Sequence, residues 1–137
     1  MKREYFIPAG LFLLDEFLKL YFRHFKVMFE WRFLSFKLST NTGALFGAFQ
    51  NTALTLAFLS LTLVGFILLN YDKLASVSEI AVNLILSGLI SNMLGRFFLN
   101  YVTDYICFSF WPCFNLADAM VVVGVALLTW KGLKTVQ

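Results

Sequence analysis

The sequence has little of what metal sites, disulfide frameworks and cofactor loops require. Its 137 residues include one histidine and two cysteines, and the spacing CFSFWPC is neither a redox CxxC pair nor a zinc pattern. A phosphate-binding glycine-rich loop is also missing. We therefore expect neither a metal ion nor an organic cofactor.

Charged residues are scarce as well. They make up 14% of the chain, and the formal net charge of +3 is spread along it. This distribution argues against a nucleic-acid partner and favours, at most, contact with lipid headgroups. Apolar residues are abundant: 60% of the chain is hydrophobic and 18% is aromatic, well above the average for soluble proteins. The composition predicts an all-α membrane protein with a single domain, residues 1–137.

Four apolar segments predict four transmembrane helices, at about residues 7–24, 46–70, 79–99 and 115–134. The second is the clearest, because no charged residue occurs from Leu38 to Tyr71 and ~20 apolar residues are enough to cross a bilayer. No small-residue cleavage site follows the first segment, so we expect it to be retained as a helix. Lysine and arginine are balanced between the two sides and do not fix the orientation.

The segment at 27–40, between the first two predicted helices, has a different period. In VMFEWRFLSFKLST, aromatic residues alternate with other side chains, which predicts one or two strands at the membrane surface. The alternative is an interfacial aromatic belt without a sheet.

Ionisable side chains in apolar segments are candidates for function, because each costs about 2.5–3.5 kcal/mol on insertion scales. Asp15 and Lys19 are four residues apart, so they share a helix face and can neutralise each other. We interpret them as a structural polar pair. The other candidates are Arg96, Asp104 and Asp118, accompanied by the asparagines Asn41, Asn92 and Asn115.

Asp104 and Asp118 stand near the two ends of the run TDYICFSFWPCFNLAD. On one straight helix, their fourteen-residue separation would hold them ~21 Å apart. Pro112 lies between them and disfavours a helix there, so we expect the chain to reverse and bring the carboxyl groups together. Of two close acids in a low dielectric, one has a raised pKa and the other stays charged. An aspartic protease uses this arrangement to activate water, and ion conductors use similar pairs.

Four motifs follow one another along the predicted spans: NTGALFG at 41–47, SNMLGRF at 91–97, VTDY at 102–105 and FNLAD at 114–118. Together with DEFLK in the first span, they resemble the lipoprotein signal peptidases (signal peptidase II) over nearly the whole chain. The resemblance implies an intramembrane aspartyl endopeptidase. Such an enzyme removes the signal peptide from lipid-modified prolipoproteins by cutting before the diacylglyceryl cysteine.

The resemblance also implies a role for each candidate residue. Asp104 and Asp118 would be the catalytic dyad. Asn41 and Arg96 would hold the substrate backbone, and Gly43 would leave room for it. Asn92 and Asn115 would support the site. Asp15 and Lys19 would match a first-helix pair with a structural role.

The resemblance further implies partners and a location. The partners would be lipidated prolipoproteins and membrane lipids, and one chain would suffice as a monomer. The protein would lie in the bacterial cytoplasmic (inner) membrane with both termini in the cytoplasm. The dyad would face the extracytoplasmic side, beside a small β-cradle formed by residues 27–40.

Three positions depart from the family pattern. The third motif usually reads G-N-x-x-D-R, and here Ser91 replaces the glycine and Gly95 replaces the aspartate before Arg96; Tyr105 stands for the usual phenylalanine. Arg96 therefore either pairs with another acid, of which Asp104 is the nearest in sequence, or binds the carbonyl groups and lipid phosphates of the substrate. If Arg96 lacks support, we expect Gly95→Asp to keep or raise activity; a clear loss would mean that Arg96 is positioned differently.

Two further pairs each have two interpretations. For Cys107 and Cys113 we expect unpaired apolar cysteines, and the alternative is a disulfide that pins the loop between the acids. Gly43 and Gly47 have GxxxG spacing, which favours close helix packing over a role of Gly43 in binding.

A different class of function also fits the same residues. The protein could be a non-catalytic relative that binds lipoproteins, or a small membrane conductor in which the acids relay ions or protons. Cleavage of a lipidated precursor separates these alternatives from a peptidase.

Overall fold

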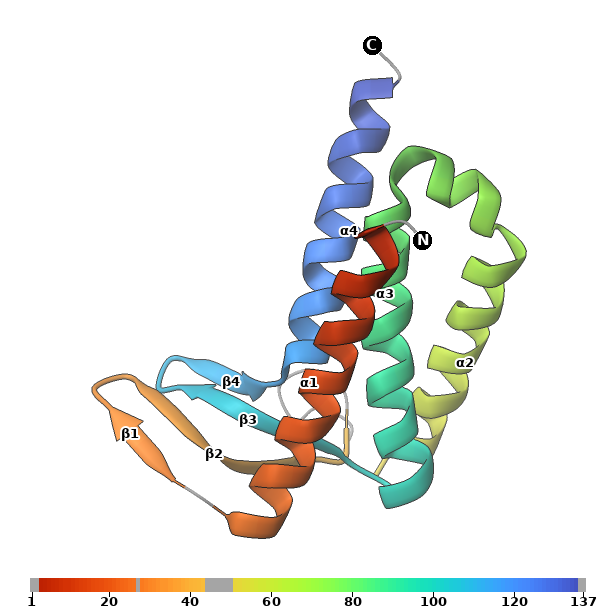
Figure 1. Cartoon of the computed structure of the whole chain (residues 1–137). Helices are drawn as coiled ribbons and strands as arrows, with labels where there is room; N and C mark the ends of the chain where they lie inside the picture. Colours follow the sequence, from red (N-terminus) through yellow and green to blue (C-terminus); the bar gives the residue numbers. More distant parts are fainter. Residues whose placement is uncertain (1–2, 27, 44–50, 136–137) are drawn as a thin grey trace.

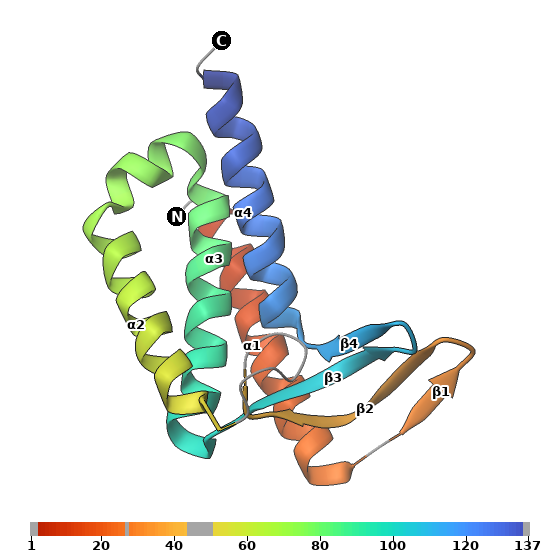
Figure 2. The ribbon, with the colours of Figure 1, turned by 180° about the vertical axis from the view of Figure 1, so that it is seen from behind.

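The computed structural model describes residues 3–26, 28–43 and 51–135 of the chain. Within them, the elements are α1 (Arg3–Phe25), β1 (Phe29–Trp31), β2 (Leu34–Asn41), α2 (Ala53–Leu69), α3 (Tyr71–Leu99), β3 (Val102–Phe108), β4 (Trp111–Phe114) and α4 (Leu116–Thr135). The helices form a bundle. The sheet projects sideways from the end of the bundle opposite to the start of α1 and the end of α4 (Figures 1 and 2).

Helix α3 packs against α1, α2 and α4. Its contact with α4 is close because each helix contributes a glycine. A Cβ at Gly88 would collide with the backbone oxygen of Ala117, and one at Gly124 would lie 2.8 Å from the backbone oxygen of Ala81. Small residues that let helix backbones approach closely are typical of helix contacts in membranes. Helix α3, which carries Asn92 and Arg96, and α4, which carries Asp118, are therefore held together by direct backbone proximity.

Helix α3 bends at Ser78, where φ is −163° and ψ is 98°. The part after the bend coincides with the third predicted helix, 79–99. The helix ends at Asn100, whose φ of 63° is left-handed and whose N–H donates to the carbonyl of Arg96 at 3.2 Å. Asparagine tolerates this conformation better than most residues, so it is a suitable helix terminator.

Pro8 lies inside α1 and is buried. Proline has no N–H, so the carbonyl four residues earlier, that of Glu4, loses its helical donor. The side-chain amide of Asn83 in α3 donates to this carbonyl at 3.4 Å, and Tyr71 donates to the other end of the same amide at 3.0 Å. An asparagine in an apolar helix thus supplies the donor that α1 lacks.

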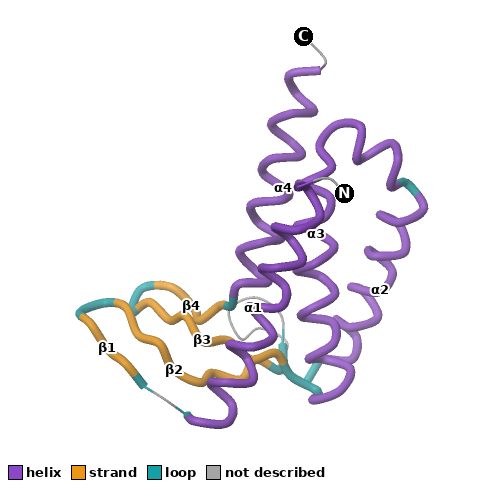
Figure 3. Tube along the Cα trace, in the orientation of Figure 1, coloured by secondary structure: helices purple, strands orange, loops and turns teal. Residues whose placement is uncertain are grey.

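The sheet is antiparallel, with strand order β1-β2-β3-β4 and two tight hairpins. The strands predicted within 27–40 are present as β1 and β2. The other two strands, β3 and β4, occupy the segment between α3 and α4, where we expect a loop from the sequence. All the described strands gather at one end of the molecule (Figure 3). Pro112 is compatible with β4 because β4 is an edge strand, where a missing N–H is tolerated.

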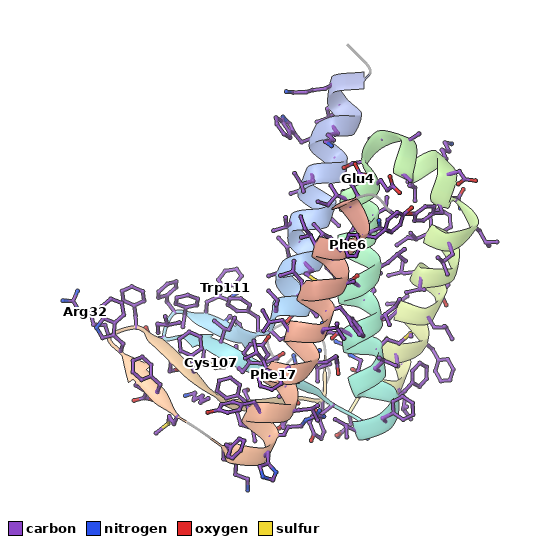
Figure 4. The ribbon with its side chains drawn as sticks, in the orientation of Figure 1. Glu4, Phe6, Phe17, Arg32, Cys107 and Trp111 are labelled. Carbon is purple, nitrogen blue, oxygen red and sulfur yellow. A yellow bond between two sulfur atoms is a disulfide. The ribbon has the colours of Figure 1, made fainter. Side chains whose placement is uncertain are left out.

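The cysteine prediction is wrong. Cys107 in β3 and Cys113 in β4 form a disulfide across the hairpin, instead of remaining unpaired. The pairing Phe108↔Trp111 in the hairpin sets the register of the two strands, and the sequence motif alone does not reveal it. Figure 4 shows Cys107 on the sheet, outside the helix bundle.

The described helices differ in how well they fit a bilayer. Helix α3 and residues 116–134 of α4 are long and apolar enough to cross a membrane, whereas α2 is a shorter apolar helix. The start of the predicted second helix, with Gly47, falls in 44–50 and lies outside the described residues. The predicted combination of four helices and a small sheet is confirmed, and two of the helices meet the requirements of a span.

Large apolar side chains cover the outside of the bundle. Phe17 of α1 is 62% exposed, Phe58 of α2 is 59% exposed and Val122 of α4 is 68% exposed. A surface of this kind is unusual for a monomer in water and is compatible with a membrane protein. The sheet also exposes aromatic rings, and Figure 4 shows Arg32 at the tip farthest from the helices and Trp111 on β4.

Candidate active site

Asp104 lies in β3 and is almost completely buried. Its pairing partner in β2 is Ser39, and the register between β2 and β3 shifts just beyond this point, between Phe36 and Ser39. An irregularity of this kind bends a strand and re-aims a side chain, and such features are common beside active sites. Asn41, at the end of β2, hydrogen-bonds to the Asp104 side chain and also accepts the N–H of Gly43 at 3.1 Å.

Asp118 lies in the first turn of α4 and forms a reciprocal cap with Asn115. The N–H of Asp118 donates to Oδ1 of Asn115 at 2.9 Å, and the N–H of Asn115 donates to Oδ2 of Asp118 at 3.1 Å. This is the capping-box arrangement, in which two otherwise unpaired helix N–H groups are satisfied by each other's side chains. The Asp118 carboxyl group is consequently fixed at the positive end of α4.

Asn115 joins the two acids. Its side-chain nitrogen donates to Oδ1 of Asp104 at 2.8 Å, while its backbone N–H holds Asp118. The same nitrogen lies 3.0 Å from Oδ1 of Asn92 and 3.3 Å from the carbonyl of Thr103. One fully buried residue therefore sets the positions of both carboxyl groups.

Asn92 links the two acids and Asn115 to helix α1. Its amide nitrogen donates to Oδ1 of Asp118 at 2.8 Å, and its amide oxygen accepts from Lys19 at 3.1 Å. Lys19 is 3% exposed and forms an ion pair with Asp15, with 2.7 Å between Nζ and Oδ2. The polar pair of the first helix is therefore connected to the acids through a single amide.

Asp15 is fully buried and accepts hydrogen bonds from several elements. Its Oδ1 accepts from the hydroxyl of Tyr105 at 2.7 Å and from the N–H of Ala117 at 3.2 Å. Its Oδ2 lies 2.6 Å from the hydroxyl of Ser91, which also contacts Lys19 at 2.6 Å. A buried carboxylate needs this many partners to offset its loss of hydration.

Burial raises the pKa of Asp104 from 3.8 to about 7, and the negative charge of Asp118 adds to the rise. Hydrogen bonds from Asn41 and Asn115 and the charge of Lys19 act in the opposite direction. Asp104 therefore retains its proton at a pH where an ordinary aspartate is ionised, as a general acid requires. Asp118 accepts from two N–H groups and lies at a helix N-terminus, which favours a carboxylate there.

Arg96 lies within electrostatic range of both Asp118 and Asp104. Within the described part of the chain, its Nε is buried without a hydrogen-bond partner. The residue before it, Gly95, is at a position where the backbone of a neighbouring segment leaves little space for a side chain. A Cβ at this position would lie 3.0 Å from the carbonyl oxygen of Tyr101, just before β3.

The structure brings the predicted site residues into one region. Asp104, Asp118, Asn92 and Asn115 are directly connected, Asn41 contacts Asp104, and Gly43 contacts Asn41. Two participants, Ser91 and Tyr105, are not among the site residues that the sequence predicts, because the motifs mark them only as departures from the family pattern. Their hydroxyl groups at motif positions were the available signal, but their partner in α1 is visible only in the fold.

Residues 7–134 match the profile of a family described as Signal peptidase (SPase) II. The chain belongs to the signal peptidase II family. A lipoprotein signal peptidase from Teredinibacter turnerae is 31% identical over 94% of this chain and 86% of its own length. One from Clostridium novyi is 35% identical over 70% of each chain. One from Halothermothrix orenii is 36% identical over 64% of this chain, and the match spans 62% of that relative.

Two solved structures share the fold of this chain. A bacterial membrane enzyme determined by the in meso method at 2.3 Å resolution has a TM-score of 0.87 and 21% identity, and covers 98% of this chain and 89% of its own. A second, determined at 1.9 Å, has a TM-score of 0.82 and 22% identity, with coverage of 96% and 92%. The helical bundle with its lateral sheet is thus the fold of known membrane enzymes.

Proposed function

We propose that this protein is an aspartyl endopeptidase that removes the signal peptide from lipid-modified prolipoproteins, cutting before the diacylglyceryl cysteine. The supporting observation is that Asn115 hydrogen-bonds to both carboxyl groups. Its side-chain nitrogen donates to Asp104, and its backbone N–H donates to Asp118. One acid is buried in a strand and the other is at a helix N-terminus, so their environments differ as acid and base roles require.

In the proposed reaction, Asp118 takes a proton from water as the water oxygen attacks the scissile carbonyl carbon. Protonated Asp104 donates its proton to the carbonyl oxygen, so the tetrahedral intermediate forms as a neutral diol. Asp118 then gives its proton to the amide nitrogen while ionised Asp104 takes a proton from one diol hydroxyl, so that the C–N bond breaks and both acids return to their starting protonation states. The products are the signal peptide with a free carboxyl group and the lipoprotein with its lipidated cysteine at the new N-terminus.

Substrate binding is proposed to use the groups around the dyad. Asn41 and Gly43 lie at the end of β2, beside Asp104, where an extended peptide could follow the strand. The buried Nε of Arg96 is an available donor for a substrate carbonyl. Asn92 and Asn115 would not bind substrate directly, because their side chains hold the two acids.

We also propose four membrane-spanning helices, a bacterial inner-membrane location, cytoplasmic termini and an extracytoplasmic dyad in a monomer. Support comes from the disulfide between Cys107 and Cys113, because disulfides persist in oxidising compartments. This bond joins β3, the strand that carries Asp104, to β4. The sheet lies at the end of the molecule opposite to the start of α1 (Figure 1). The exposed aromatic rings of the sheet match a membrane–water interface.

The test is cleavage of a diacylated precursor by the purified protein in detergent, read as a mass loss equal to the signal peptide. Asp104→Asn and Asp118→Asn should each lower the rate of cleavage by at least a thousandfold, while the protein stays folded. Asp72→Asn is the matched control, because Asp72 is exposed in the first turn of α3. Full activity in either dyad variant would refute the proposal.

The alternatives predict other results in the same assay. A non-catalytic relative would bind the precursor without any cleavage by the wild-type protein. An ion or proton conductor would instead move charge across reconstituted vesicles, and this flux would depend on Asp104 and Asp118.

A further inference from the structure

Two hydroxyl groups from different elements meet on one buried carboxylate. Tyr105 in β3 donates to Oδ1 of Asp15 at 2.7 Å, and Ser91 in α3 lies 2.6 Å from Oδ2. All three residues are 2% exposed or less.

The same carboxylate holds the first turn of α4. The N–H of Ala117 donates to Oδ1 of Asp15 at 3.2 Å, and the N–H of Leu116 donates to the hydroxyl oxygen of Tyr105 at 3.1 Å. The first N–H groups of a helix have no partner within the helix, so they depend on groups supplied from outside. Tyr105 and Asp15 supply two of them, and the Asn115–Asp118 cap supplies others.

Tyr105 therefore joins the two parts of the candidate site. It follows Asp104 directly in β3, and its hydroxyl binds the helix turn that carries Asp118. Its ring is stacked on Phe22 of α1, with 5.2 Å between ring centroids and 3° between planes, which limits its freedom to move. The strand with one acid and the helix with the other are thus tied together by one side chain.

We propose that Tyr105 is a positioning residue: with Ser91, it anchors Asp15 and so fixes the first turn of α4, and hence Asp118, relative to Asp104. Tyr105 acts through Asp15 and the N–H of Leu116, and not through contact with the reacting atoms. Ser91 acts through the same carboxylate and has a single proton to share between Asp15 and Glu16, each 2.6 Å from its oxygen. The effects of the two hydroxyls should therefore be coupled.

The first experiment is kinetic and rests on the proposed peptidase function. Tyr105→Phe keeps the ring and removes only the hydroxyl. We expect kcat for a diacylated precursor, per folded protein, to fall about tenfold, with KM changed less than twofold. Tyr21→Phe is the control, because Tyr21 is 38% exposed on α1 and should give wild-type kcat. An unchanged kcat for Tyr105→Phe would overturn the proposal.

A double-mutant comparison tests the coupling. Ser91→Ala alone should lower kcat several-fold, and the double variant with Tyr105→Phe should lose less than the product of the two single effects. Independent effects that multiply would overturn the shared action through Asp15.

The second experiment needs no enzyme activity. Amide hydrogen exchange in detergent should speed up at least tenfold at Leu116 and Ala117 in Tyr105→Phe, while α2 keeps its wild-type protection. Unchanged exchange at the start of α4, or an equal increase in every helix, would overturn the proposal. If the wild-type protein does not cleave the precursor, the proposed function fails, and this exchange result still decides whether Tyr105 anchors α4.

Discussion

Asp104 is a strand residue surrounded by protein on all sides, next to a second acid. Both circumstances favour its protonated form, and the amides of Asn41 and Asn115 only partly offset them. At the scale of single residues, the proposed chemistry thus depends on surroundings that differ between two chemically identical side chains.

The pH dependence of cleavage follows from this difference. The pKa of Asp104 is raised from 3.8 to about 7 in the folded protein, so its proton is present below that pH and lost above it. We expect kcat/KM to decline through pH 7, approaching tenfold per pH unit at higher pH, because the general acid is then deprotonated. Initial rates between pH 5 and 9 would check this, and a rate that rises steadily through pH 7 would contradict it.

Gly95 has a steric role that the motif comparison does not reveal. A Cβ there would lie 3.0 Å from the carbonyl oxygen of Tyr101 and would push the chain that leads into β3. Both Gly95→Ala and Gly95→Asp should therefore lower activity several-fold, as measured by precursor cleavage, with a lower Tm. Higher activity for Gly95→Asp together with an unaffected Gly95→Ala would show instead that Arg96 lacks an acidic partner.

At the scale of elements, the sequence predicts helices better than strands. Apolar segments indicate the helices directly, and alternation indicates β1 and β2. The strands β3 and β4 escape this approach because Pro112 and a run of aromatics look like a turn, and because β3 pairs with β2, far away in sequence. The acids and asparagines of the site were predictable from their motifs, whereas the contacts of Ser91 and Tyr105 with Asp15 depend on packing between elements.

The β3–β4 hairpin gives a prediction at this scale. The disulfide closes a short loop, with a sequence separation of six, so its removal should lower the free energy of unfolding by about 2 kcal/mol. The double variant Cys107→Ser with Cys113→Ser should show a lower Tm in detergent, and a reducing agent should bring the wild-type protein to the same value. A Tm that neither treatment changes would mean that the bond does not stabilise the hairpin.

At the scale of the whole molecule, the sheet lies at one end, and the start of α1 and the end of α4 lie at the other (Figures 1 and 2). Asp104 belongs to β3 of this sheet, and Asp118 to the first turn of α4. The proposed orientation can be tested with single cysteines in the variant without Cys107 and Cys113. We expect Trp111→Cys to react with a membrane-impermeant maleimide on intact cells, because Trp111 is 55% exposed on the sheet. Leu133→Cys, at a position 65% exposed near the end of α4, should react only after permeabilisation. The reverse labelling pattern would invert the topology.

The buried ion pair of α1 has a consequence for biogenesis. Asp15 and Lys19 find their partners on α3, β3 and α4, all of which are synthesised after α1. Until then, the two charges can be neutralised only within α1, by the ion pair between them, and a charge left unpaired would cost about 2.5–3.5 kcal/mol at the bilayer centre. The surroundings of α1 are therefore completed only when these later elements are in place, and its stable residence in the membrane is a product of assembly as well as of its own hydrophobicity.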